Sequence, residues 1–153
     1  MRPGGCRLLG ANMKRYFVAV DIAAAAEKVW TLVSDASSYA GWNSTIERFE
    51  GVISPGATVT LYAKAMPNRP FKLTVKTFEP PRLLVLEGGA PLGLFVGTRR
   101  LELTPQGAAA CRFEMEEVLH GPLSPLMARL IPDQQPTFEV YAADLKRRAE
   151  RGQ

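Results

Sequence analysis

An arginine and a glutamate fall inside two successive apolar patterns, and they are the residues best suited to chemistry. Every second residue forms these patterns, which are Phe95, Gly97, Arg99, Leu101 and Leu103, followed by Cys111, Phe113, Met115, Glu117 and Leu119. Such alternation is typical of β-strands, in which alternate residues share one face. If the chain turns at residues 106–108, Arg99 and Glu117 lie opposite each other, or one step apart, on the inward face.

Charges in that position need each other, because either one alone would be costly to remove from water. We therefore predict that Arg99 and Glu117 pair, and that the pair anchors the polar end of a ligand whose remainder is apolar. Alternatively, the two side chains are solvated at a rim, or neutralise each other, and bind no ligand.

Large apolar side chains are predicted to line the same space. They are Trp30, Trp42, Phe71, Leu84, Leu86, Phe95, Phe113, Met115 and Tyr141. Taken singly, each is better explained as ordinary core packing, and only the set suggests a ligand-binding surface. Tyr141 and Trp30 also carry polar hydrogens that could orient a bound molecule.

Several other kinds of site are excluded or disfavoured. His120 is the only histidine, so no metal site can use several imidazoles, and we expect it on the outer face near a turn. Glu116 and Glu117 are adjacent in a strand and point to opposite faces, so they cannot act as a carboxylate pair. The glycines at 88, 89, 93 and 97 lack the lysine and the following helix of a phosphate-binding loop. We expect neither a metal nor a cofactor.

The elements that position these residues follow from periodicity and turn chemistry. Strands are predicted at residues 14–22, 45–53, 57–65, 71–79, 82–88, 92–104 and 108–120. Helical patterns cover residues 24–34, 35–42 and 123–150, and Pro132 and Pro136 should interrupt the last one. The short connections predict antiparallel neighbours, so the fold class is α+β. One terminal helix cannot fill the space beneath a curved sheet, and an internal hollow is the expected result.

The bulk properties describe one ordinary domain. The chain has 153 residues and a formal charge of +4, and its basic residues cluster near the two ends rather than on one face, which disfavours nucleic acid. The two cysteines, Cys6 and Cys111, have no metal or redox spacing, and a reduced cytoplasmic protein fits best. No apolar run reaches the roughly 18 residues that span a bilayer. We expect residues 1–13 to be a disordered tail and residues 14–151 to form a single ligand-binding domain.

Short motifs along the chain resemble those of one known superfamily. They are Val29-Trp30, Asp35, Tyr39, Trp42-Asn43, Ile46, Pro81-Arg82-Leu83, the run from Gly97 to Pro105, Gly121-Pro122-Leu123 and Leu145-Lys146. Over residues 14–150 the chain resembles the START-type helix-grip superfamily (SRPBCC), also labelled polyketide cyclase/dehydrase and lipid transport. The resemblance implies a curved seven-stranded antiparallel sheet around a long carboxyl-terminal helix, with a deep apolar cavity for lipids, polyketides or aromatic molecules. The two prolines depart from the usual continuous helix.

The sequence favours a carrier that binds or sequesters a hydrophobic or amphipathic small molecule, with no integral membrane contact, and it leaves a homodimer open. The alternative is an enzyme, a cyclase, dehydratase or hydrolase, that uses Glu117 or Arg99 with help from Tyr141. A third hypothesis is that the protein is a partner-binding module. It would need an apolar outer sheet face, where the pattern instead places mostly charged residues such as Lys72, Lys76 and Arg112.

Overall fold

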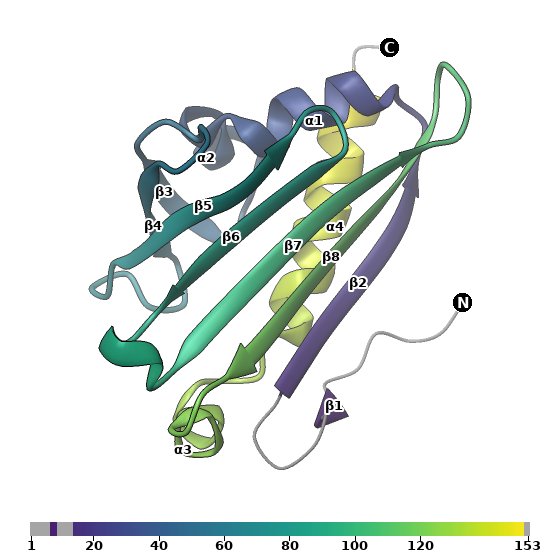
Figure 1. Cartoon of the computed structure of the whole chain (residues 1–153). Helices are drawn as coiled ribbons and strands as arrows, with labels where there is room; N and C mark the ends of the chain where they lie inside the picture. The colour runs from purple at the N-terminus through teal and green to yellow at the C-terminus, as the bar shows by residue number, and fades with distance from the viewer. Residues whose placement is uncertain (1–6, 9–13, 152–153) are drawn as a thin grey trace.

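A single curved antiparallel sheet with one long helix across its concave face makes up most of the molecule (Figure 1). The computed structural model describes residues 7–8 and 14–151. The strands follow the order β1-β2-β8-β7-β6-β5-β4-β3. The strands from β3 to β8 form the meander of antiparallel neighbours that the sequence predicts. Strand β2 joins its far edge beside β8, a pairing that the sequence did not specify. Of the predicted tail, only the two residues of β1 are described, and the rest lies outside the described residues.

The seven predicted strands are present, most of them with shorter bounds, and a two-residue strand at residues 7–8 adds an eighth to the sheet. The strands are β1 (Arg7–Leu8), β2 (Lys14–Ile22), β3 (Ile46–Glu50), β4 (Thr58–Ala63), β5 (Phe71–Glu79), β6 (Leu83–Gly89), β7 (Val96–Pro105) and β8 (Cys111–His120). The predicted start of the sixth strand at residue 92 is wrong. Leu92 and Gly93 have φ values of 63° and 67°, so the chain turns there in a short 3-10 segment, η2 (Pro91–Gly93). Left-handed backbone cannot continue an extended strand.

The helices agree with the predicted order but differ at their ends. They are α1 (Ala26–Ser34), the 3-10 turn η1 (Ala36–Ser38), α2 (Tyr39–Trp42), α3 (Ser124–Leu130) and α4 (Gln135–Glu150). The terminal helix is split as predicted, and Pro132 lies in the break. Pro136 does not interrupt a helix, because it lies in the first turn of α4, where the amide hydrogen that it lacks would have no partner.

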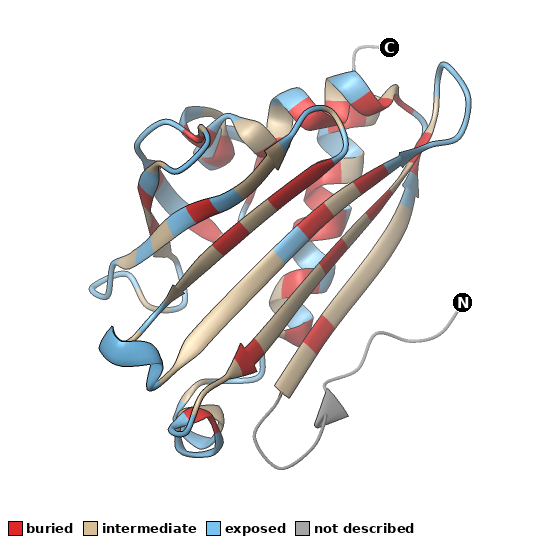
Figure 2. Ribbon diagram, in the orientation of Figure 1, coloured by how far each residue is buried: buried red, intermediate tan, exposed pale blue. Residues whose placement is uncertain are grey.

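The core lies between the sheet and α4, as the buried segments of Figure 2 show. The apolar stripe of α4 supplies Phe138, Tyr141 and Leu145, each at most 3% exposed. Asp144 of the same helix is also buried, and its Oδ2 accepts hydrogen bonds from the backbone N–H and the hydroxyl of Ser44, both 2.7–2.8 Å long. This fastens the helix to the start of the meander. Within the described residues, no helix is long and apolar enough to cross a membrane.

Candidate functional site

Arg99 and Glu117 face each other on the concave side of the sheet. They are direct partners in the β7–β8 register, and Arg99 Nε lies 3.5 Å from Glu117 Oε1. Their side chains are 20% and 17% exposed, so the pair is largely but not fully removed from water. The predicted ion pair is confirmed. On the outer face of the same two strands, the adjacent residues Arg100 and Glu116 are also direct partners in the register.

The pair leaves most of its hydrogen-bonding capacity unused. A guanidinium carries five N–H donors and an ionised carboxylate has two acceptor oxygens. Among the described residues, neither side chain makes a hydrogen bond, and the 3.5 Å ion-pair contact is looser than a charge-assisted hydrogen bond. Gly97 leaves room beside them, because a Cβ there would lie 3.8 Å from Glu117 Oε1.

A buried tyrosine adjoins the pair. Tyr16 of β2 is the direct register partner of Glu117, is 0% exposed, and has a hydroxyl with no hydrogen-bond partner among the described residues. Phe138 of α4 joins the group, since its ring centroid lies 5.7 Å from that of Tyr16 and 5.0 Å from the Arg99 guanidinium carbon. Tyr16, Glu117 and Arg99 thus form one row across three adjacent strands, called here the polar row.

Tyr16 is not among the site residues that the sequence predicts. The alternation of the first strand places Tyr16, Val18 and Val20 on one face, which signals that the side chain is inward. The register between β2 and β8 was the missing information, because these strands are about a hundred residues apart in the chain.

Two further tyrosines form a hydrogen-bonded pair in the core. The hydroxyls of Tyr39 and Tyr141 are 2.8 Å apart, and the Tyr39 hydroxyl donates to the Val33 carbonyl at 2.6 Å. Because Tyr39 has one hydroxyl proton, Tyr141 must donate to Tyr39. Burial raises the pKa of Tyr141 to about 12 and that of Tyr39 well above its ordinary value, although the Arg99 charge opposes both shifts. Both groups are neutral at physiological pH, and the Tyr141 proton is already engaged.

The other predicted lining residues separate into three groups. Trp42 and Phe113 contact the Tyr141 ring, with centroids 5.4 and 6.0 Å away. Leu84, Leu86 and Met115 are buried on the sheet, and Phe71 and Phe95 are half-buried at the end where β7 begins. Trp30 packs edge-on against Phe78, 5.4 Å between centroids.

Two hollows of the described structure lie outside the space between the sheet and α4. One hollow, of about 410 Å³, lies outside the sheet-and-helix core between α1 and the end of α4, and is lined by Lys28, Thr31, Leu32, Arg148 and Arg151. Another, of about 190 Å³, lies on the outer sheet face beside Arg15 and Glu116. Neither is the expected internal chamber, which stays a prediction. Where it was expected, aromatic rings of α2, α4 and β8 lie close to one another.

The chain belongs to the polyketide cyclase / dehydrase and lipid transport family, whose sequence pattern matches residues 13–150. No functionally curated protein matches the chain.

Similar solved structures agree with this fold. Truncated norcoclaurine synthase from Thalictrum flavum has a TM-score of 0.70 at 15% identity, over 96% of this chain and 99% of that one. The ZhuI aromatase/cyclase from Streptomyces sp. R1128 has a TM-score of 0.69 at 14% identity, with 91% and 94% covered. A START superfamily protein from Mycobacterium smegmatis has a TM-score of 0.67 at 18% identity, with 89% and 97% covered. At these identities the likeness establishes the START-type helix-grip fold alone.

Proposed function

We propose that the protein binds a hydrophobic or amphipathic small molecule between the sheet and α4, with the polar end of the molecule on the polar row. The observation that carries the proposal is the unused hydrogen-bonding capacity of Tyr16, Arg99 and Glu117, three neighbours on the concave face. A buried hydroxyl without a partner costs about 1–3 kcal/mol, and a ligand group that accepts its proton would recover that cost.

The charges of the polar row indicate which polar group fits. Arg99 and Glu117 sum to zero, so a ligand carboxylate would bring a second negative charge beside Glu117. An uncharged hydroxyl, phenol or amide avoids this repulsion. It can accept from Tyr16 or Arg99 while it donates to Glu117. We therefore expect a neutral, hydroxyl-bearing apolar molecule rather than a fatty acid.

The apolar remainder of the ligand would lie along Phe138 and the sheet. Val18, two residues from Tyr16 on the same face of β2, is only partly buried, whereas Phe113, Leu145 and Ala149 toward the other end of α4 are 0% exposed. Binding would therefore widen the gap at the amino-terminal end of α4, near the break at Pro132. Burial of apolar surface, about 25 cal/mol per Å², would drive it.

A second candidate function is catalysis by the same residues. The likeness to an aromatase/cyclase and to norcoclaurine synthase supports it, as does a glutamate beside an unpartnered tyrosine hydroxyl. Glu117 would move a proton of the bound molecule, and Tyr16 and Arg99 would stabilise charge that develops on its oxygen. A carrier returns its ligand unchanged, so product analysis after incubation separates the two functions.

Calorimetric titration with three matched probes tests the binding proposal. The probes are 1-naphthol, 1-naphthoate and naphthalene, which share an apolar body and differ in the polar group. We expect 1-naphthol to bind tightest, and Glu117→Gln and Arg99→Met to weaken it about tenfold, the effect of one charge-assisted hydrogen bond. Arg100→Met is the matched control on the outer face. Equal affinity for all three probes, or an equal effect of the control, would rule out the polar row as the anchor.

A further inference from the structure

Exposed leucines gather at one end of the molecule. Seven large hydrophobic residues are exposed in the described chain, and five of them belong to η2, α3 and the residues beside these segments. The five are Leu92 (95% exposed), Leu94 (40%), Leu123 (39%), Leu126 (54%) and Leu130 (69%). We call them the leucine end. Single exposed apolar residues are common, but a group of this kind marks an interaction surface.

The two segments that carry these leucines are joined by their backbones. The Leu123 N–H donates to the Leu94 carbonyl at 2.8 Å. Gly121 permits this approach, since a Cβ there would lie 2.7 Å from the Leu94 oxygen. The exposed leucines of η2 and α3 therefore belong to one connected surface.

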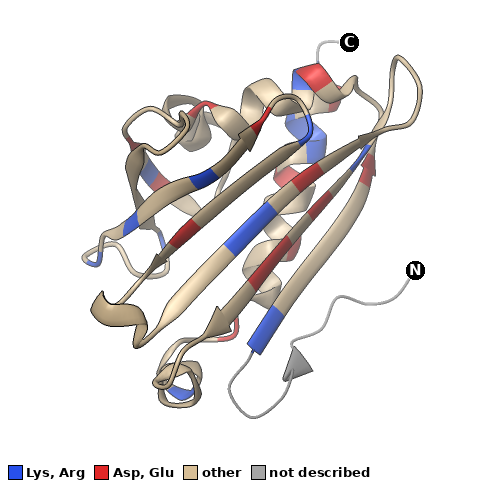
Figure 3. Ribbon diagram, viewed as in Figure 1, with Lys and Arg blue, Asp and Glu red and all other residues tan. Residues whose placement is uncertain are grey.

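Positive charge surrounds the leucine end. Because the sheet is antiparallel, the connections 64–70, 90–95 and 121–134 all lie at the same end of it. They carry Lys64, Arg69 and Arg129 against one acidic residue, Asp133. Figure 3 shows basic positions on the β4–β5 loop and on α3. None of the three basic side chains has an ion-pair partner among the described residues, and all three are exposed.

Leu92 carries two unfavourable free-energy terms in the free protein. It is almost completely exposed, and its φ of 63° lies in the left-handed region, which costs a residue with a Cβ roughly 1 kcal/mol. The side chain therefore projects from a tight turn as an isolated apolar tip. Such tips, with cations around them, match the boundary between lipid headgroups and acyl chains.

We propose that the leucine end docks on the surface of an anionic lipid bilayer, inserting its leucines while Lys64, Arg69 and Arg129 contact acidic headgroups. A second copy of the chain fits less well, because a two-fold interface would set the same unpaired cations against each other. Arg99 and Glu117 lie near this end of β7 and β8, so docking would bring the polar row toward the lipid. The docking proposal does not depend on the ligand proposal.

Vesicle co-sedimentation tests the proposal with the full chain. One set of vesicles contains phosphatidylcholine alone, and the other contains equal amounts of phosphatidylcholine and phosphatidylglycerol. We expect binding to the acidic vesicles, reduced about tenfold or more by the triple variant Leu92→Ser, Leu126→Ser, Leu130→Ser. Reversing Arg69 and Arg129 to Glu should reduce it at least about fivefold for each charge.

Matched controls lie at the opposite end of the molecule. Val52→Ser removes an apolar side chain that is 76% exposed, and Arg148→Glu reverses an exposed charge near the end of α4. Neither should change vesicle binding. The proposal is overturned if the protein binds neither kind of vesicle, or if the controls weaken binding as much as the leucine variant. It is also overturned if sedimentation without lipid shows a dimer that the leucine variant dissociates, since the occupant would then be a second copy.

Discussion

Replacing Tyr16 by phenylalanine should make the free protein more stable and its ligand complex weaker. The substitution removes only the hydroxyl, which is fully buried and has no partner in the described structure. The ring and its 5.7 Å contact with Phe138 are retained. Relief of an unsatisfied buried hydroxyl is worth about 1–2 kcal/mol. For a chain of this length, each 1 kcal/mol raises the melting temperature by about 2–4 °C.

The same hydroxyl should contribute affinity once a ligand oxygen accepts its proton. Its loss should weaken 1-naphthol binding about tenfold, equivalent to about 1.4 kcal/mol. Thermal unfolding with and without 1-naphthol measures both effects. Tyr16→Phe should raise the melting temperature without the probe and reduce the further rise that the probe causes.

Tyr39→Phe is the control of opposite sign. It removes a hydroxyl that donates to the Val33 carbonyl and accepts from Tyr141, so two buried polar groups lose their partner. We expect it to lower stability by about 1–3 kcal/mol. If Tyr16→Phe lowers stability as Tyr39→Phe does, the Tyr16 hydroxyl already has a partner in the free protein and is not held open for a ligand.

Three further predictions concern the ion pair, its neighbouring glycine and the end of α4. Arg99→Met should destabilise the protein by about 2 kcal/mol because it leaves Glu117 largely buried without its partner, whereas the double variant with Glu117→Leu should recover most of the loss in urea unfolding. Gly97→Ala should weaken 1-naphthol binding several-fold in calorimetry, because its Cβ would occupy space 3.8 Å from the Glu117 carboxylate and would push on Leu119 Cδ2 at 3.3 Å; unchanged affinity would place the ligand elsewhere. A hydrogen bond from the backbone N–H of Ala23, and to a lesser extent one from Lys146, lowers the pKa of Glu150 below its ordinary value of 4.5. The stability that the Glu150 carboxylate contributes is therefore fully present above pH 4.5 and is lost as the pH falls through the lowered pKa. The melting temperature of Glu150→Gln should therefore lie below that of the unmodified chain at neutral pH and converge with it in acid, and a constant difference would contradict the assignment.

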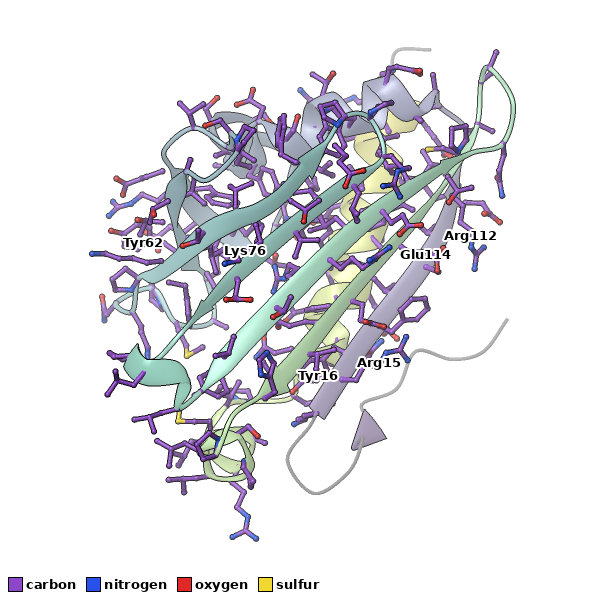
Figure 4. The ribbon with its side chains drawn as sticks, viewed as in Figure 1. Arg15, Tyr16, Tyr62, Lys76, Arg112 and Glu114 are labelled. Carbon is purple, nitrogen blue, oxygen red and sulfur yellow. The ribbon has the colours of Figure 1, made fainter. Side chains whose placement is uncertain are left out.

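The ion pair could be predicted because its geometry is local. A short turn near Gln106 joins β7 to β8, and such a turn sets the register that brings Arg99 opposite Glu117. The same alternation correctly placed the charges of the outer face, where Figure 4 shows Lys76, Arg112 and Glu114. The hypothesis that the outer face binds a protein partner therefore gains no support.

Features that depend on distant pairing or on backbone turns were not predictable in this way. The position of Tyr16 depends on the β2–β8 register, which no local turn specifies. Leu92 and Leu94 continue the alternation of a strand, yet a left-handed turn exposes both. Periodicity reports which residues are apolar, and it cannot distinguish an extended apolar segment from an exposed loop.

How closely the side chains pack in the interior could not be predicted from the sequence pattern either. The sequence identifies Trp42, Phe113 and Tyr141 as inward residues, but whether their rings pack together or line a space depends on rotamers and helix position. In the described structure these rings are in contact.

Native mass spectrometry of the protein isolated from its own host shows whether the polar row holds a small molecule. We predict a bound, uncharged, hydroxyl-bearing apolar molecule, lost or strongly reduced in Tyr16→Phe and Glu117→Gln and retained in the outer-face variant Arg100→Met. A protein that carries no small molecule, or one that carries it equally in all three variants, would contradict the assignment of the polar row as a ligand anchor.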